Sequence, residues 1–499
     1  MTGTGRLTGE LGLLTRRLVY GEPTEAELAA ELALMTRVDR AHLVMLAEQE
    51  LVPATTAALL LRCIDELAGT EFSALRSRPA PRGLYLMYEG YLIERLGPEV
   101  GGVLHSGRSR NDLKATITAL RLREWLPDFI GQAVRLEAIL LSRARAYSGV
   151  LMPAYTHFQA AMPVSYGYYL LGVALAVGRE IDALAAAGSG LEACPLGAGA
   201  VAGTDLPINP ERAARLLGFS AAAPHALDAV ASRDVPLRLL AGAASLAVVL
   251  SRLGTDLQLW STAEFGFVEF PDHLVGGSSA MPQKRNAFLL EHVKAKAGHV
   301  TGAWGAAAGM MTAAPFTNSI EVGTEAMAAI WPGLAAARQS VLLSQVLVSG
   351  ARPVPDRMRQ RAAESFTAAT WLANRLVRQG VPFRTAHRMV GEAVRKALAA
   401  GSTELADFGP PGWLDGIEVS RLDLADLMRA HGRGGGPGAF AWVFADAVAR
   451  WDAHRRWHLD WRQASRDADA ALAAAAGRLT DLTPVLGHSA VEQSPVEPG

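Results

Sequence analysis

Residues Asp112–Tyr147, DLKATITALRLREWLPDFIGQAVRLEAILLSRARAY, carry apolar side chains at helical spacing along their whole length. Leu113, Ile117 and Leu120 fall on one face of a helix with 3.6 residues per turn. If the stretch is helical throughout it spans roughly 50 Å, and Pro127 predicts a kink within it. The stretch indicates a protein built from long helices.

The helical pattern continues on both sides of this stretch. Glu25–Leu34 is rich in strong helix formers, and Thr24 before it is suited to an N-cap. Val164–Gly178 has no charge on any face, which predicts a helix buried in the middle of a bundle or in a subunit interface. Asp234–Ser251 and Glu291–Met311 are two further apolar helical segments. Since no βαβ alternation and no glycine-rich phosphate loop occurs, the sequence predicts an all-α fold.

The chain length of 499 residues is too great for one compact core and favours two or three domains. Turn-rich breaks lie near Leu104–Gly107 and Gly350–Pro355. They predict an N-terminal helical domain over residues 1–107, a central helix-bundle domain over 108–355 and a C-terminal helical domain over 356–499. The tail after residue 480 is predicted to be disordered.

Charge and cysteine content narrow the class of protein. The 48 basic residues balance 49 acidic residues, which gives no support to a nucleic-acid or membrane partner. Cys63 and Cys194 build no disulfide framework and lack metal-ligand spacing, as in proteins of a reducing cytosol. The apolar run Leu239–Leu250 is too short to span a bilayer. We therefore expect a soluble, cytoplasmic protein.

Three polar segments interrupt the helical background, and the first is LHSGRSRND, Leu104–Asp112. Asn111 or Asp112 would serve as the N-cap of the helix that follows, and taken alone the segment favours this structural role. Ser109, Arg110 and Asn111 also supply a hydroxyl, a guanidinium and an amide beside a helix N-terminus. These groups suit a bound carboxylate.

The second polar segment is MPAYTHFQAAMP, Met152–Pro163. A lone histidine in an apolar region is most often a core residue with satisfied hydrogen bonds. His157, however, lies between Thr156 and Gln159 in a segment that begins and ends near prolines. A rigid turn there would hold the imidazole where it can act as an acid or a base.

The third polar segment is VGGSSAMPQKRN, Val275–Asn286. Its two glycines and two serines suit a flexible surface loop. The segment also carries a hydroxyl, the Lys284 ammonium and the Asn286 amide, and a helix resumes directly after it. A mobile loop that delivers such groups to a pocket acts as a lid. From the residues alone, the prediction ends at an anion site with a lid.

The order and the residues of these segments resemble those of one protein family. HSGRSRND, MPAYTHFQAAMP, PLGAGAVAGTDLPI, LDAVASRD, LWSTAEFGFVEFPD and GGSSAMPQKRN are similar to argininosuccinate lyase, within the aspartase and fumarase superfamily. The resemblance runs from about Asp39 to Thr312 and returns at Leu376–Val394. It implies a three-domain, all-helical subunit whose long central helices form a twenty-helix core in a homotetramer. Each active site would then take residues from three subunits.

The resemblance also implies a reaction, a β-elimination that breaks a C–N bond in an N-substituted aspartate and releases fumarate. Ser278 on the mobile loop would be the base, and Lys284 and Asn286 would hold the developing dianion. His157 would assist protonation of the leaving amine, oriented by Glu291. The substrate, a small dicarboxylate, would be gripped by further residues of the three segments, namely Ser109, Arg110, Asn111, Thr156, Gln159, Ser279 and Met281. The reaction would need no metal or organic cofactor.

Some residues depart from the family pattern. An EDIH-type segment reads RGLY at Arg82–Tyr85, and Ala287 stands where a proline is expected. After Ala314, in PFTNSIEVGTEA, the family tyrosine and lysine that face the arginine half of the substrate are missing, and Glu321 and Glu325 bring acidic groups instead. We therefore predict a leaving amine other than arginine, with Glu321 pairing with a compact ammonium.

Several alternatives stay open. The two glutamates would equally suit the cap or the solvated face of a helix. An ordinary argininosuccinate lyase is the main alternative activity, and a catalytically silent structural protein of the same fold is an alternative of another class. Fumarase, aspartase and adenylosuccinate lyase share the serine loop but are not expected to combine GRSRND with EFGFVE.

Overall fold

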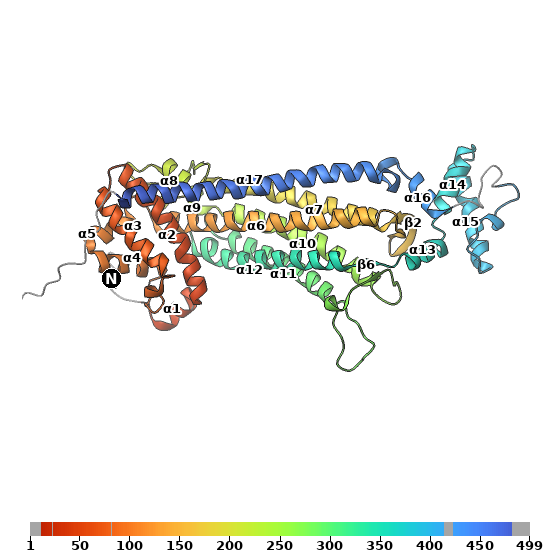
Figure 1. Cartoon of the computed structure of the whole chain (residues 1–499), viewed down its shortest axis with the longest axis horizontal. Helices are drawn as coiled ribbons and strands as arrows, with labels where there is room; N and C mark the ends of the chain where they lie inside the picture. Colours follow the sequence, from red (N-terminus) through yellow and green to blue (C-terminus); the bar gives the residue numbers. More distant parts are fainter. Residues whose placement is uncertain (1–10, 22, 81, 414–422, 482–499) are drawn as a thin grey trace, which may run out of the picture.

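The computed structural model describes residues 11–21, 23–80, 82–413 and 423–481. The predicted disordered tail lies, from residue 482 onward, outside these residues. The molecule is elongated, with a group of helices at one end, a bundle of long helices in the middle and a smaller group of helices at the other end (Figure 1).

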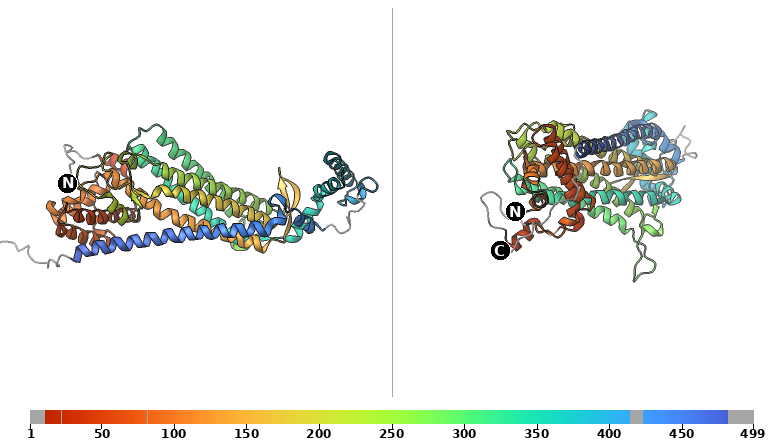
Figure 2. Two further views of the ribbon diagram at one scale, coloured as in Figure 1. Left: turned by 90° about the horizontal axis from the view of Figure 1, so that it is seen from above. Right: turned by 60° about the vertical axis from the view of Figure 1, so that its left-hand side comes forward.

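The N-terminal group of helices sits across one end of the bundle (Figures 1 and 2). Thr24 is the N-cap of α2, as predicted, and forms a capping box in which its side chain and that of Glu27 each accept a backbone N–H. The helices of this group are α1 (Leu13–Tyr20), α2 (Glu25–Glu48), α3 (Ala54–Gly69), α4 (Leu84–Leu96) and α5 (Pro98–Gly101).

The central bundle consists of long helices that lie side by side (Figures 1 and 2). Helix α6 packs against α7, α12 and α17, and α10 packs against α7, α11 and α12. The helices are α6 (Arg110–Ala146), α7 (Tyr166–Gly188), α10 (Asp234–Trp260), α11 (Phe288–Thr312), α12 (Ala326–Gly350) and α17 (Phe440–Asp481). With 37 residues, α6 is about 55 Å long, and it continues through Pro127 without a break.

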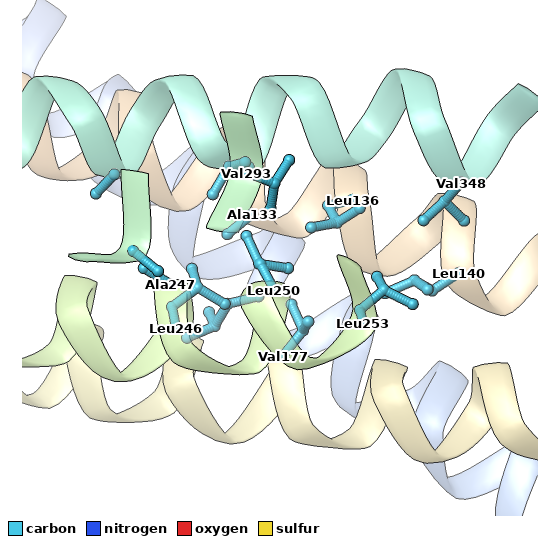
Figure 3. Close-up of a cluster of buried hydrophobic side chains, with 14 of the residues drawn as sticks. Ala133, Leu136, Leu140, Val177, Leu246, Ala247, Leu250, Leu253, Val293 and Val348 are labelled. Carbon is cyan, nitrogen blue, oxygen red and sulfur yellow. The ribbon is translucent and has the colours of Figure 1, made fainter. Parts of the chain in front are cut away.

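The core of the bundle is a layer of aliphatic side chains from five helices (Figure 3). Leu136 and Leu140 of α6 lie near Leu250 of α10, with Val177 of α7 and Val348 of α12 beside them. Each of these side chains is fully buried or nearly so. Burial of a leucine or valine side chain stabilises a fold by roughly 1.5–3 kcal/mol, so this layer holds the helices together.

Helix α10 is, among the described residues, long and apolar enough by length and composition to cross a membrane. The run Leu239–Leu250 is thus part of a 27-residue helix, and the expectation that it is too short does not hold. The packing of α10 explains its apolar composition, because its buried face contacts three other helices of the bundle (Figure 3). A core helix of a soluble protein has the same composition.

The uncharged segment Val164–Gly178 lies in the bundle, as predicted. Helix α7 begins at Tyr166, after Ser165, whose hydroxyl accepts the Tyr168 N–H at 3.0 Å. It packs against α6, α10 and α17 of the same chain. Most of its apolar side chains are therefore covered without a second subunit.

A few short strands accompany the helices. β1 (Leu151–Thr156) and β2 (Gln159–Ser165) form an antiparallel hairpin at the far end of α6. The others form two-residue pairs, parallel between β3 (Ala193–Cys194) and β4 (Ala221–Ala222), antiparallel between β5 (Val268–Glu269) and β6 (Arg352–Pro353). The fold class is all-α, as predicted, with these strands as connections.

The remaining helices lie between and beyond the long ones. They are α8 (Pro210–Leu216), α9 (Ala226–Ala231), α13 (Pro355–Glu364), α14 (Ala369–Arg378), α15 (Phe383–Ala399) and α16 (Leu424–Ala430). A separate apolar cluster around Leu372, Val390 and Trp413 holds α14 and α15 together. Helix α17 then returns along the bundle to the N-terminal helices (Figure 1). The division at residues 107 and 355 stays a proposal.

Candidate functional site

The first polar segment forms the N-terminus of α6. The N-cap is Ser109, not Asn111 or Asp112, because the Ser109 hydroxyl accepts the Asn111 N–H at 3.2 Å. Asp112 completes a capping box by accepting the Ser109 N–H at 2.9 Å. Ser109 has the extended backbone that an N-cap needs, so that Arg110 and Asn111 lie in the first turn of the helix. The N–H groups and dipole of this turn favour an anion.

Asp112 is buried and does more than cap the helix. Its second oxygen accepts the N–H groups of Gly197 at 3.0 Å and Gly199 at 2.9 Å. Burial raises the pKa of this carboxyl, and the N–H donors oppose that rise. The Asn111 amide donates to the Ala200 carbonyl at 3.0 Å. The segment PLGAGA is thus held against the first turn of α6.

An ion pair lies beneath this loop. The Arg108 guanidinium and the Asp39 carboxylate are 2.5 Å apart, and both side chains are fully buried. The Tyr85 hydroxyl is 2.8 Å from His105 Nδ1 and accepts an N–H of Arg108 at 3.4 Å. Tyr85, the last residue of the RGLY segment that departs from the family pattern, therefore contacts the loop that leads to Ser109. Sequence reasoning missed Asp39 and Arg108 because neither has a local pattern that reveals the other.

The second polar segment is the tip of the β1–β2 hairpin. Thr156 pairs with Gln159, and His157 and Phe158 between them have φ of 52° and 59°. Both residues adopt the left-handed conformation that a tight hairpin turn requires, which is uncommon for such side chains. His157 is exposed, and Phe158 is 79% exposed. The interpretation of His157 as a core residue is therefore wrong for this chain.

The third polar segment is an exposed loop that projects from the side of the bundle (Figure 1, green). Its ends are joined by two backbone hydrogen bonds, from Gly276 N to Asn286 O at 2.9 Å and from Asn286 N to Gly276 O at 2.8 Å. Within it the Ser278 hydroxyl accepts the N–H groups of Met281 at 3.1 Å and Ala280 at 3.4 Å. Ser279, Met281 and Lys284 are exposed.

Glu291 lies in the first turn of α11, just after this loop. Its carboxylate accepts the Gln258 amide N–H at 3.1 Å, and Lys294 donates to the same Gln258 side chain. The predicted role of Glu291 in orienting His157 stays a prediction, since Gln258 is the partner within this chain.

Glu321 begins a π-helical turn, Glu321–Glu325, ahead of α12. It is exposed, and a hydrogen bond from its own backbone N–H lowers the pKa of its carboxyl. Facing this turn, Lys114 of α6 donates to the Thr324 hydroxyl at 2.6 Å. The turn therefore lies beside the N-terminal part of α6, near Asn111.

Helix α6 separates the first two polar segments. Ser109 precedes its first residue and Thr156 follows its last residue by ten positions, so a rod of about 55 Å lies between them. The serine loop leaves the bundle elsewhere, between α10 and α11 (Figure 1). The structure joins Lys114, in the second turn of α6, to Thr324 of the π-helical turn. It does not bring the three polar segments together within the described residues of one chain.

Solved structures of all-α lyases of the aspartase and fumarase superfamily share this bundle of long helices. A class II fumarase from Schistosoma mansoni shares the fold, with a TM-score of 0.65 at 14% identity over 82% of this chain and 95% of that chain. An EDDS lyase variant with bound fumarate superposes with a TM-score of 0.82 at 28% identity, covering 96% of this chain and 98% of that one.

Sequence comparison narrows the class to one family. Residues 46–302 match the family model for lyase, and residues 366–411 match that for the argininosuccinate lyase C-terminal region. The argininosuccinate lyase of Methanoculleus marisnigri is 39% identical over 74% of this chain and 77% of its own length. That of Corynebacterium glutamicum is 35% identical over 89% of this chain and 96% of its own length. The chain belongs to the argininosuccinate lyase family of carbon–nitrogen lyases.

Proposed function

We propose that this lyase cleaves an N-substituted L-aspartate to fumarate and an amine, or adds an amine to fumarate in the reverse direction. The observation that carries the proposal is the Ser278 hydroxyl, which accepts two backbone N–H groups within an exposed loop. N–H donors aimed at this oxygen favour its alkoxide form, which a serine needs in order to act as a base.

The roles of the other groups follow from the charge that develops. Removal of a proton next to a carboxylate places a second negative charge on that carboxyl group. Lys284 and Asn286, on the same loop as the base, would stabilise this dianion. The N-terminus of α6, with Ser109, Arg110 and Asn111, together with Thr156, would bind the carboxylates. His157, exposed on its turn, would give a proton to the leaving amine.

We also propose a homotetramer in the cytoplasm whose active sites each combine residues of three chains, because the polar segments lie far apart within one chain. The observation behind the oligomer is α11, whose buried residues are only Leu290, Val293, Ala297, Val300 and Ala307. From residue 297 to residue 320 the chain carries no Asp, Glu, Lys or Arg, yet Trp304 is 40% and Met310 39% exposed. A monomer would leave this apolar surface in water.

Static light scattering of the purified protein is expected to give four times the chain mass. The same helices of neighbouring subunits would then cover α11, since the interfaces of symmetric oligomers are self-complementary. Trp304→Glu should shift the protein towards smaller species, whereas Trp442→Glu, at a 73% exposed position of α17, should not. A stable, active monomer would contradict shared active sites.

The identity of the leaving amine is the finer part of the proposal. We propose an amine other than arginine, because the family tyrosine and lysine are missing from residues 315–325 and the exposed Glu321 carboxylate could meet a cationic group. The relatives named argininosuccinate lyase support the main alternative, argininosuccinate itself. The likeness to EDDS lyase supports a different amine.

One assay tests both parts, the absorbance of fumarate released from a panel of N-substituted aspartates that includes argininosuccinate. We expect turnover of at least one compound and a kcat/KM for argininosuccinate below that of the best alternative. No turnover across the panel, in either direction, would refute the proposed reaction. A preference for argininosuccinate by more than about tenfold, roughly 1.4 kcal/mol of transition-state binding, would identify an argininosuccinate lyase.

A further inference from the structure

We propose that Tyr155 is a positioning residue of the reaction, since its ring fixes the β1–β2 hairpin whose tip carries Thr156 and His157. The inference rests on the proposed function, which assigns a carboxylate contact to Thr156 and proton donation to His157. The ring packs against the segment Glu264–Glu269, EFGFVE, a motif of the family resemblance that supplies no group to the proposed chemistry. Tyr155 would act through the two tip residues rather than on the substrate itself.

Strand β1 leaves the protein interior on its way to the tip. Leu151–Pro153 is buried, Tyr155 is half-buried and Thr156 is exposed. The inner end of the strand packs against α13 beside the bundle (Figure 1), and Leu151 belongs to an apolar cluster with residues of α13 and α16. Tyr155 is therefore the last side chain of β1 that is not exposed.

A β-bulge separates this inner end from the tip. The pairing shifts by one residue between Pro153 and Tyr155, so that two residues of β2 stand opposite Ala154. A bulge bends and twists the strands and reorients the side chains beyond it. Because the regular ladder is interrupted at this point, the direction of the tip depends on contacts that are made beyond the bulge.

The ring of Tyr155 makes such a contact. Its centroid lies 5.7 Å from that of Phe265 at an interplanar angle of 60°, and 6.3 Å from that of Phe267 at 49°. Aromatic pairs at these distances and tilts attract each other beyond the burial of their surface. The Tyr155 hydroxyl is buried and has no hydrogen-bond partner in the described structure. The ring, rather than the hydroxyl, therefore holds the hairpin.

The two phenylalanines form a fixed surface. They pack edge to face at 5.5 Å and 86°, and Phe267 is 1% exposed. The Phe267 N–H donates to the Trp260 carbonyl at 2.8 Å, and the Phe267 carbonyl accepts the Val354 N–H at 2.8 Å. Between the two rings Gly266 has a φ of 62°, the left-handed conformation that glycine adopts without strain. The EFGFVE motif thus builds a rigid aromatic support beside the hairpin.

A groove of ≈ 320 Å³ lies between this support and the tip, lined in part by Tyr155, Phe158 and Phe265. Phe158, the neighbour of His157, is 79% exposed and so gives the tip little support. Loss of the Tyr155 ring would enlarge the groove and let the tip move towards it. A displacement of about 1 Å at a reacting group can cost about a hundredfold in rate.

The first test compares two substitutions at Tyr155 in the assay of fumarate release. Tyr155→Leu removes the ring and should lower kcat by about ten- to a hundredfold. Tyr155→Phe keeps the ring and removes only the hydroxyl that lacks a partner in the described structure, so its kcat should stay within about twofold of wild type.

Double variants show whether Tyr155 acts through its neighbours. Phe265→Leu should reproduce the loss, and the Tyr155→Leu, Phe265→Leu protein should lose no more than about twofold beyond either single variant, because the two rings form one contact. Adding Tyr155→Leu to His157→Gln should lower kcat by less than about threefold, since no imidazole is left to position. If the His157→Gln protein is inactive, the Tyr155 and Phe265 pair decides the result.

Tyr147→Leu is the matched control. Tyr147 is also half-buried, and its ring lies 5.6 Å from that of Tyr166, but it follows the last residue of α6 and is not part of the hairpin. Loss of this ring should lower the melting temperature about as much as Tyr155→Leu does, while kcat stays within about twofold of wild type.

Three outcomes would overturn the proposal. A kcat of Tyr155→Leu within about twofold of wild type would show that the ring does not position the tip. An equal loss in Tyr155→Phe would assign the effect to the hydroxyl, and an equal loss in Tyr147→Leu would assign it to general destabilisation. A wild-type protein that releases no fumarate from any substrate, and adds no amine to fumarate, would instead refute the proposed function and this role with it.

Discussion

Ser278→Ala is expected to lower kcat by a factor between about a hundred and ten thousand, the usual contribution of a positioned general base. The KM should change little, because the hydroxyl acts mainly in the transition state. The physical reason is that the alanine methyl cannot take the proton from the substrate carbon. The loop itself should keep its shape, because the hydrogen bonds between Gly276 and Asn286 that close it involve only backbone atoms. Fumarate release, followed by its absorbance, measures the effect.

Ser279→Ala is the matched control for this variant. Ser279 is the next residue and is exposed, whereas Ser278 is half-buried and accepts the N–H groups of Met281 and Ala280. The Ser279 variant should therefore lose far less activity. A larger loss for Ser279→Ala than for Ser278→Ala would reassign the base to Ser279, and equal, complete losses with an altered secondary structure would point to a collapsed loop.

Asp39→Ala is expected to destabilise the protein by about 3–5 kcal/mol, the usual cost of removing one partner of a buried ion pair. The Arg108 guanidinium would remain fully buried with no carboxylate beside it, since Asp39 lies 2.5 Å away and both side chains are inaccessible to solvent. Two nitrogens of Arg108 already lack a hydrogen-bond partner in the described structure. Urea unfolding followed by circular dichroism gives the change in free energy.

Asp65→Ala is the control for the buried pair. Asp65 pairs with Arg40 at 3.3 Å, but the two side chains are 43% and 33% exposed. Water screens such a pair, so the loss should be about 1 kcal/mol or less. The double variant Asp39→Leu with Arg108→Met should recover most of the stability by removing both charges. If Asp39→Ala lowered the free energy of unfolding no more than Asp65→Ala does, the ion pair of Asp39 with Arg108 would not hold the Ser109 loop.

Much of the fold could be predicted from the sequence because helical periodicity is a local property. Asp112–Tyr147 predicts almost the whole of α6, and Thr24 predicts the start of α2. The three polar segments were also visible, because Gly, Ser and charged residues stand out against an apolar background. The N-cap of α6 was predicted wrongly, since Ser109, Asn111 and Asp112 are all good caps and only the backbone conformation separates them.

By itself the sequence determined the helical class, the long helices and the residue types available for carboxylate and acid–base chemistry, and its motifs determined the family. Only the tertiary structure decided which distant residues meet. Lys114 and Thr324 are 210 positions apart, and Arg108 reaches Asp39 on another helix. The physical reason is that spacing along the chain encodes each helix separately. Contacts between helices depend on their lengths and on the packing of the core, which spacing along the chain does not encode.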